Sequence, residues 1–185
     1  MEKFGLDDLL RHAFAGAVFL ITVIVAYHKS LSRLFSELPH LDGSTVLTVG
    51  TGAILLCGSL IYVLHRIVYH YAIYRILIPR VWGNPHPSPM TLDLNRFRRR
   101  IRTESLQRSM GEWASQVHFL YCVAWAVLLG LLSGIPLFGH LGAYAGWRLL
   151  GFAGVILIAA VFHNKRYLAY ECEIERQESG ATSTP

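Results

Sequence analysis

Four apolar stretches, each close to the length of a membrane-spanning helix, dominate this chain of 185 residues. They cover residues 13–27, 45–64, 117–138 and 143–162. A helix needs about 20 mainly apolar residues to cross the hydrocarbon core of a bilayer. The first stretch is shorter, but apolar residues just before it can extend it. The pattern predicts an all-α, polytopic membrane protein with four transmembrane helices in one domain, residues 1–170.

The overall composition agrees with a membrane protein. The chain is 53% hydrophobic and only 16% charged, whereas soluble domains are about 25% charged. The net charge of +5 is concentrated, because seven arginines fall between Arg80 and Arg108. A basic block beside apolar spans is typical of the cytoplasmic side of a membrane protein rather than of a nucleic-acid-binding surface.

The distribution of basic residues predicts the orientation. The segment 79–116 holds the seven arginines, and Lys165 and Arg166 follow the fourth span. Between the first two spans, Lys29 and Arg33 are balanced by two acidic residues. The positive-inside rule therefore places both termini and the segment 79–116 in the cytoplasm. Residues 171–185 form a cytoplasmic tail.

The basic segment contains a helical pattern of its own. Apolar residues recur at spacings of three to five over residues 94–117, and arginines occupy much of the remainder. This pattern predicts a cytoplasmic amphipathic helix that lies against anionic lipids. Alternatively, its arginines dock an acidic protein or RNA, which would make the protein a membrane scaffold. The arginines concerned are Arg96, Arg98, Arg99, Arg100 and Arg102.

The second span continues past its apolar part, to residue 78 before Pro79. A helix over residues 45–78 would be about 50 Å long, against a hydrocarbon core of about 30 Å. The excess carries polar aromatic and basic residues: Tyr62, His65, Arg66, Tyr69, His70 and Tyr74. At 3.6 residues per turn, four of them, at positions 62, 66, 70 and 74, fall close to one stripe. The stripe faces either lipid headgroups or the mouth of an assembly, and we favour the assembly.

Five histidines fall at the predicted inner level of the membrane: His12, His65, His70, His118 and His163. Imidazole ligates metals and haem, and a haem would need two histidines on facing helices, such as His70 and His118. A proton relay is another interpretation. Histidine also favours interfaces for its half-polar ring, and this is the interpretation that we favour.

Motifs of enzymes are missing from the sequence, since it contains no HExxH, CxxC or GxSxG pattern. We therefore predict no catalytic residue and no cofactor. A redox or lipid-modifying enzyme that uses the inner histidines stays an alternative to a non-enzymatic protein.

Two GxxxG patterns predict close helix packing. They are formed by Gly130 with Gly134 and by Gly142 with Gly146. Small residues at this spacing let two helix backbones approach closely in lipid. The packing can lie within one chain or between chains, and we expect a homo-oligomer.

The N-terminal motif DDLLRHAFAGAVFLI, which contains Arg11 and His12, carries a resemblance. Together with four short spans and a basic cytoplasmic segment, it resembles the accessory membrane pore proteins of type VI-B CRISPR systems. The resemblance implies an oligomeric pore that depolarises the inner membrane during phage infection. It assigns no role to Arg11 and His12.

The same family has been linked to a degenerate ribonuclease-type motif, an Arg followed by a His after four to six residues. Here Arg66 and His70 have three residues between them. Arg33 and His40 have six, but the predicted topology places them outside the cytoplasm. The resemblance therefore carries no catalytic residue over to this chain.

Overall fold

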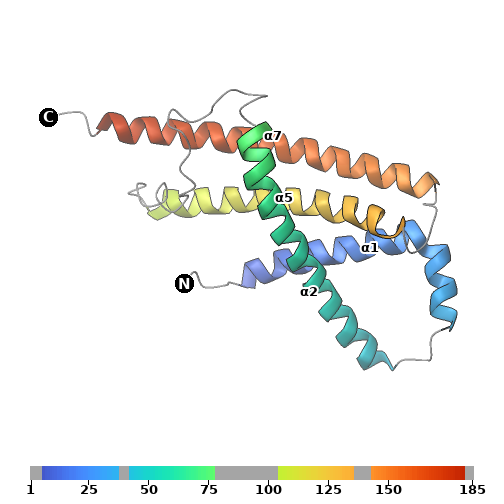
Figure 1. Cartoon of the computed structure of the whole chain (residues 1–185). Coiled ribbons are helices and arrows are strands. Elements are labelled where there is room, and N and C mark those ends of the chain that lie inside the picture. The colour runs from blue at the N-terminus through green and yellow to red at the C-terminus, as the bar shows by residue number, and fades with distance from the viewer. Residues whose placement is uncertain (1–5, 38–41, 78–103, 136–142, 182–185) are drawn as a thin grey trace. The chain divides into compact units, whose positions relative to one another are not determined.

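A computed structural model describes residues 6–37, 42–77, 104–135 and 143–181 of the chain (Figure 1). This described part is helical and contains no strand. Its elements in chain order are α1 Leu6–Glu37, α2 Gly43–Val68, the π-helix η1 Tyr69–Leu77, α5 Glu104–Ser133 and α7 Ala143–Ala181.

Four of the helical segments are long and apolar enough to cross a membrane. They cover Leu10–Arg33, Gly43–Ile73, Arg108–Ser133 and Gly146–Tyr170. The prediction of an all-α protein with four candidate transmembrane helices is confirmed, and the helices are those of a multi-pass membrane protein. The arginines predicted for the cytoplasmic amphipathic helix, positions 96–102, lie outside the described residues.

The helices extend further than the apolar stretches that revealed them. The first candidate span has 24 residues, and α1 continues to Glu37. The third begins at Arg108, inside the segment 79–116 that the sequence assigns to the cytoplasm. Polar residues continue a helix readily once it is started, because the backbone bonds do not depend on apolar side chains. The apolar stretches alone therefore predict the cores of the helices and not their ends.

The continuation of α2 is a π-helix, where the sequence predicts ordinary α-helix up to residue 78. In η1 the backbone bonds run from i to i+5, which makes the turn wider than 3.6 residues. Residues four apart are therefore no longer one turn apart after Tyr69. The stripe predicted through positions 62, 66, 70 and 74 loses its regular spacing in its second half.

The chain divides into two compact units, which we describe separately. Unit 1 comprises Met1–Arg66 and Phe119–Ile158, and unit 2 comprises Ile67–His118 and Ala159–Pro185. Unit 1 thus contains α1, most of α2, the second half of α5 and the first half of α7. Unit 2 contains η1, the first half of α5 and the second half of α7.

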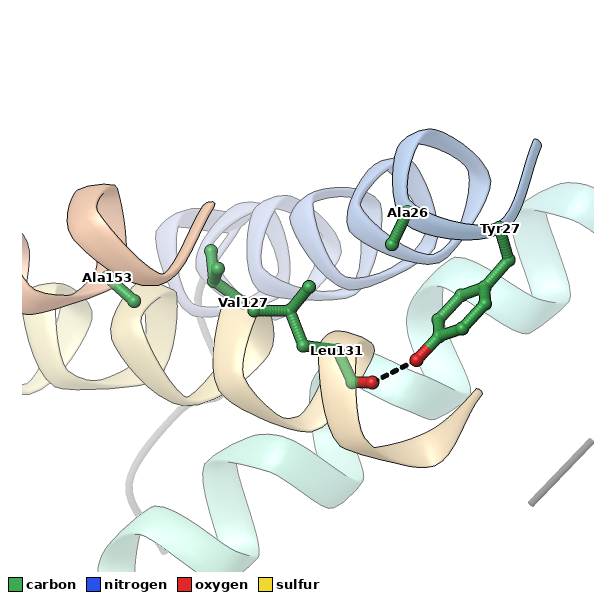
Figure 2. Packing of buried hydrophobic residues seen from close by; sticks show 5 residues of the cluster. All are labelled: Ala26, Tyr27, Val127, Leu131 and Ala153. Carbon is green, nitrogen blue, oxygen red and sulfur yellow. Dashed lines mark hydrogen bonds between the residues drawn. The ribbon is translucent and has the colours of Figure 1, made fainter. Parts of the chain in front are cut away.

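A bend in α1 lies at an apolar core of unit 1. Tyr27 has non-helical backbone angles, φ −121° and ψ 21°, and α1 changes direction there (Figure 1). The Tyr27 hydroxyl donates a hydrogen bond to the Leu131 carbonyl of α5 (Figure 2). Around this bond, Ala26, Val127, Leu131 and Ala153 are buried together, so that α1, α5 and α7 share one apolar core.

Glycines bring the helix backbones of unit 1 together. A Cβ on Gly16 would overlap the Ile54 carbonyl of α2, and a Cβ on Gly58 would overlap the His12 carbonyl of α1. The two helices therefore cross with their backbones in contact, as Figure 1 shows for α1 and α2. Such close crossings are the usual way to pack helices in lipid, because an apolar side chain gains nothing by moving from lipid tails to a contact between helices.

The first predicted GxxxG pattern packs α5 on α1 within the chain. A Cβ on Gly130 would lie 2.9 Å from the Thr22 side chain, and one on Gly134 would overlap the Tyr27 ring. Of the second pattern, Gly146 is buried and Gly142 lies outside the described residues.

Candidate functional site

The buried side of α2 in unit 1 passes through Gly58, Ile61 and His65, which recur at spacings of three and four. Tyr62 and Arg66, one position further along, are half-buried. The side chains of His70 and Tyr74, also predicted for the polar stripe, lie outside the described residues. In unit 1 the fully buried polar position of α2 is therefore His65, and not a member of the predicted stripe.

His65 stacks on a tyrosine that the sequence analysis did not single out. Its side chain is fully buried, and its ring centroid lies 5.4 Å from that of Tyr121 in α5, with 16° between the planes. Polar and ionisable groups inside a membrane span are costly and are candidates for function. Tyr121 was not predicted, because an apolar stretch does not reveal which side of its helix faces a partner helix.

The N-terminal motif takes part in the crossing of α1 and α2. The His12 ring lies 4.6 Å from the Tyr62 ring, and the His12 carbonyl faces Gly58. Arg11 is half-buried at the same turn. The structure thus places His12 beside α2 and gives it a packing role.

In unit 2, Tyr69 connects to a buried amide. Its hydroxyl donates a hydrogen bond of 3.0 Å to Oδ1 of Asn164, which is fully buried. The Tyr69 ring also meets His118 edge-on, with centroids 4.7 Å apart. Asn164 was not predicted, although an asparagine just beyond an apolar stretch is a signal that could have marked it.

A second aromatic group in unit 2 surrounds Trp113 of α5. Its ring lies 5.6 Å from His163, 6.0 Å from Tyr167 and 5.7 Å from Tyr170, all of α7. The spacings of four and three along α7 place the three partners on one side of that helix. We call Trp113, His163, Tyr167 and Tyr170 the aromatic cluster.

The predicted inner histidines each lie beside an aromatic ring where their side chains are described. His12 and His65 do so in unit 1, and His118 and His163 do so in unit 2. Among the described residues, no group of three or more His, Cys, Asp or Glu side chains is arranged to hold a metal ion. The pair proposed for haem, His70 and His118, includes a side chain outside the described residues.

The first half of α2 offers a surface of a different kind. Every residue over positions 42–49 is exposed. Four exposed hydroxyl side chains, two of them beyond these positions, lie on one side of the helix. They recur at spacings of four, three and eight, which keeps them on that side. We call them the hydroxyl stripe: Ser44, Thr48, Thr51 and Ser59, all exposed.

Glycine accompanies the hydroxyl stripe. Gly52 lies on the same side of α2 and is exposed, and nothing in the structure lies within 4 Å of a Cβ added to Gly50 or Gly52. The Thr48 hydroxyl donates to the Ser44 carbonyl at 2.9 Å, one turn back along the helix. The surface combines small residues and hydroxyls, the two residue types that membrane helices use to associate.

Comparison with known proteins finds no relative of this chain. No protein-family model, curated protein or solved structure matches it. The resemblance carried by residues 7–21 therefore stays a prediction, and the functional interpretation rests on the residues described above.

Proposed function

We propose that this chain is a non-enzymatic inner-membrane protein that assembles into homo-oligomers. Once assembled, it perforates or perturbs the bilayer in anti-phage or stress defence. The observation that carries the proposal is the exposed hydroxyl stripe of α2, because a single chain leaves it with no protein surface to face.

The exposed sides of α7 and α2 suit different surroundings. In unit 1, α7 exposes large apolar side chains, such as Trp147, Phe152 and Val155, which suit lipid tails. The hydroxyl stripe suits either another helix or water. Hydroxyls hydrogen-bond across membrane helices, and small residues let backbones approach closely enough for them to do so. A second copy of the chain, packed along α2, would satisfy both requirements.

The buried share of each candidate span also supports an assembly built on α2. Only 11% of the apolar window in the α2 span is buried, against 50% in the α5 span. The α5 span is therefore the most covered of the four candidate spans, whereas the α2 span has most of its surface available to other molecules. In an assembly built on α2, the hydroxyl stripe would line the contact between copies or the opening that they surround.

Enlarging Gly52 tests the assembly. Gly52→Leu fits the single chain, since a Cβ there meets nothing within 4 Å, but it would hold a second helix away. We expect the variant to purify as a monomer and to lose ion flux in liposomes. Gly151→Leu in α7 is the matched control, because Gly151 is also exposed with open space around it. We expect this control to keep both assembly and flux.

Two outcomes would overturn the proposal. If the wild-type protein is strictly monomeric in native mass spectrometry and conducts no ions in liposomes, neither assembly nor perforation occurs. If Gly151→Leu dissociates the protein and Gly52→Leu does not, the interface lies on α7 and the assignment to α2 is wrong.

A further inference from the structure

Hydrogen bonds at the start of α2 fix where its hydroxyl hydrogens point. The Ser44 and Thr45 hydroxyls bond the Asp42 carboxylate, and the Thr48 hydroxyl bonds the Ser44 carbonyl at 2.9 Å. An ionised carboxylate and a carbonyl accept but cannot donate, so each hydroxyl gives its one hydrogen and keeps its oxygen lone pairs. All three hydroxyl residues are exposed. They therefore present acceptor oxygens to their surroundings and have no hydrogen left to donate to another helix.

A full negative charge lies at the same end of the hydroxyl stripe. Asp42 is exposed, and its bond with Ser44 places its carboxylate beside the first residue of the stripe. Hydrogen bonds from Ser44 and then Thr45 lower the pKa of Asp42, so its carboxyl is ionised at neutral pH. The helix N-terminus beside it carries the equivalent of only about half a positive charge. The net charge at this end of the stripe is therefore negative.

The basic residues described in unit 1 do not cancel this charge along the stripe. Lys29 and Arg33 are exposed, but they belong to α1 and not to α2. Arg66 lies in α2 and is half-buried. At the helical rise per residue it is about 36 Å further along the helix than Asp42. That distance is several times the Debye length of about 8 Å at physiological ionic strength, so Arg66 has little effect on ions near Asp42.

We infer that the opening of the proposed homo-oligomer passes cations in preference to anions, and that Asp42 selects them. The inference rests on the proposed function, since a single chain surrounds no opening. Copies inserted in one orientation would bring their Asp42 carboxylates to the same mouth, and rings of acidic side chains select cations in channels. The acceptor oxygens of Ser44 and Thr48 continue inward from this ring and offer a cation further oxygen contacts.

Reversal potentials across planar lipid bilayers test this inference. Under a gradient of potassium chloride, the sign of the potential shows which ion passes, and its size gives the permeability ratio of the two ions. We expect the wild type to favour potassium over chloride by about fivefold or more, the effect of one unit charge about 4 Å from an ion in water. Asp42→Asn removes the charge and keeps a residue that caps helices well. We expect this variant to conduct, but to pass potassium and chloride about equally.

Glu112→Gln is the matched control. Glu112 is exposed, like Asp42, and its replacement removes the same charge, but it lies in α5 and not beside the hydroxyl stripe. We expect Glu112→Gln to keep the preference of the wild type for potassium. If Asp42→Asn keeps that preference, the assignment to Asp42 is wrong, whatever the result for Glu112→Gln.

Failure of this inference can be told apart from failure of the proposed function. A wild type that conducts but passes both ions equally would overturn the selection of cations and leave assembly and perforation in place. A wild type that prefers chloride would do the same, and it would indicate that Arg66 rather than Asp42 sets the selectivity. A wild type that is monomeric and passes no ions would overturn both proposals.

Discussion

Two parts of α2 carry glycine, and they use it differently. Gly58 lies against the His12 carbonyl of α1, so that any side chain there would push the two backbones apart. Gly50 and Gly52, in the first half of the same helix, have open space where a side chain would be. Gly58 therefore serves the packing of the single chain. Gly50 and Gly52 leave the backbone of α2 open on its outer side, where a partner helix can approach closely.

The largest effect is expected where the glycine is in contact. Gly58→Leu would place its side chain inside the α1 backbone, and neither backbone can move without opening unit 1. Overpacking by a few methylenes already costs about 1–3 kcal/mol, so we expect little folded protein. Yield and monodispersity in gel filtration, with the helix content from circular dichroism, measure this.

Gly52→Leu is the control for the same substitution in the same helix. It should yield normal amounts of helical protein, whatever it does to assembly. If Gly58→Leu folds and melts like the wild type, the crossing of α1 and α2 is not backbone to backbone, and the contrast between the two glycine positions disappears.

A smaller effect is expected at the contact between α1 and α5. The Leu131 carbonyl is among the last four of α5, which ends at Ser133, and these carbonyls have no partner inside their helix. The Tyr27 hydroxyl supplies the missing donor. Tyr27→Phe leaves that acceptor buried and unsatisfied, which costs about 1–3 kcal/mol. We expect Tm in detergent to fall by several degrees.

The matched variant is Tyr62→Phe, which removes the hydroxyl from a half-buried tyrosine of the same unit. We expect this change to shift Tm less than Tyr27→Phe does. An equal or larger shift for Tyr62→Phe would show that the end of α5 does not depend on Tyr27.

These contacts show which features of the fold can be predicted from the sequence. Apolar stretches predict four helices because the thickness of lipid sets their length. The GxxxG pattern of Gly130 and Gly134 predicts close packing, but not that the partner is α1. Which helix meets which depends on the rotation of each helix about its axis. The apolar stretches contain too few polar residues to reveal that rotation.

The candidate site was predictable to a similar extent. His65 and Tyr69 were predicted as candidates, because histidine and tyrosine stand out in a hydrophobic helix. Their partners on other helices, Tyr121 and Asn164, were not predicted. The π-helix η1 was not predicted either, since the residues from Tyr69 to Leu77 contain no glycine or proline to mark a change of helix type. The choice of a π-helical bond pattern is not visible in local sequence.

The smallest effect is expected at the exposed start of α2, which has few contacts to hold it. Residues 42–49 are all exposed, so the first turns depend on local bonds. Asp42 precedes the helix, and its carbonyl accepts a hydrogen bond of 3.1 Å from the Val46 N–H. Its carboxylate accepts hydrogen bonds from the Ser44 and Thr45 hydroxyls. A negative charge at the N-terminal end of a helix also interacts favourably with the positive end of the helix dipole.

The same bonds give the helix start a dependence on pH. Hydrogen bonds from Ser44 and then Thr45 lower the pKa of Asp42. A carboxyl whose pKa is lower in the folded state stabilises that state fully above its unfolded pKa, about 3.9. The contribution is lost as the pH falls through the lower, folded value.

Hydrogen-exchange protection of the amides over residues 46–49, corrected for intrinsic rates, should therefore be higher at pH 7 than at pH 3. Asp42→Ala should lower the protection at pH 7 and remove the difference between the two pH values, while amides near Gly58 stay unchanged because tertiary contacts hold them. Both measurements are made in the Gly52→Leu background, in which no second copy is expected to cover the start of α2. Undiminished protection on adding Asp42→Ala there would mean that something other than the cap orders the start of α2.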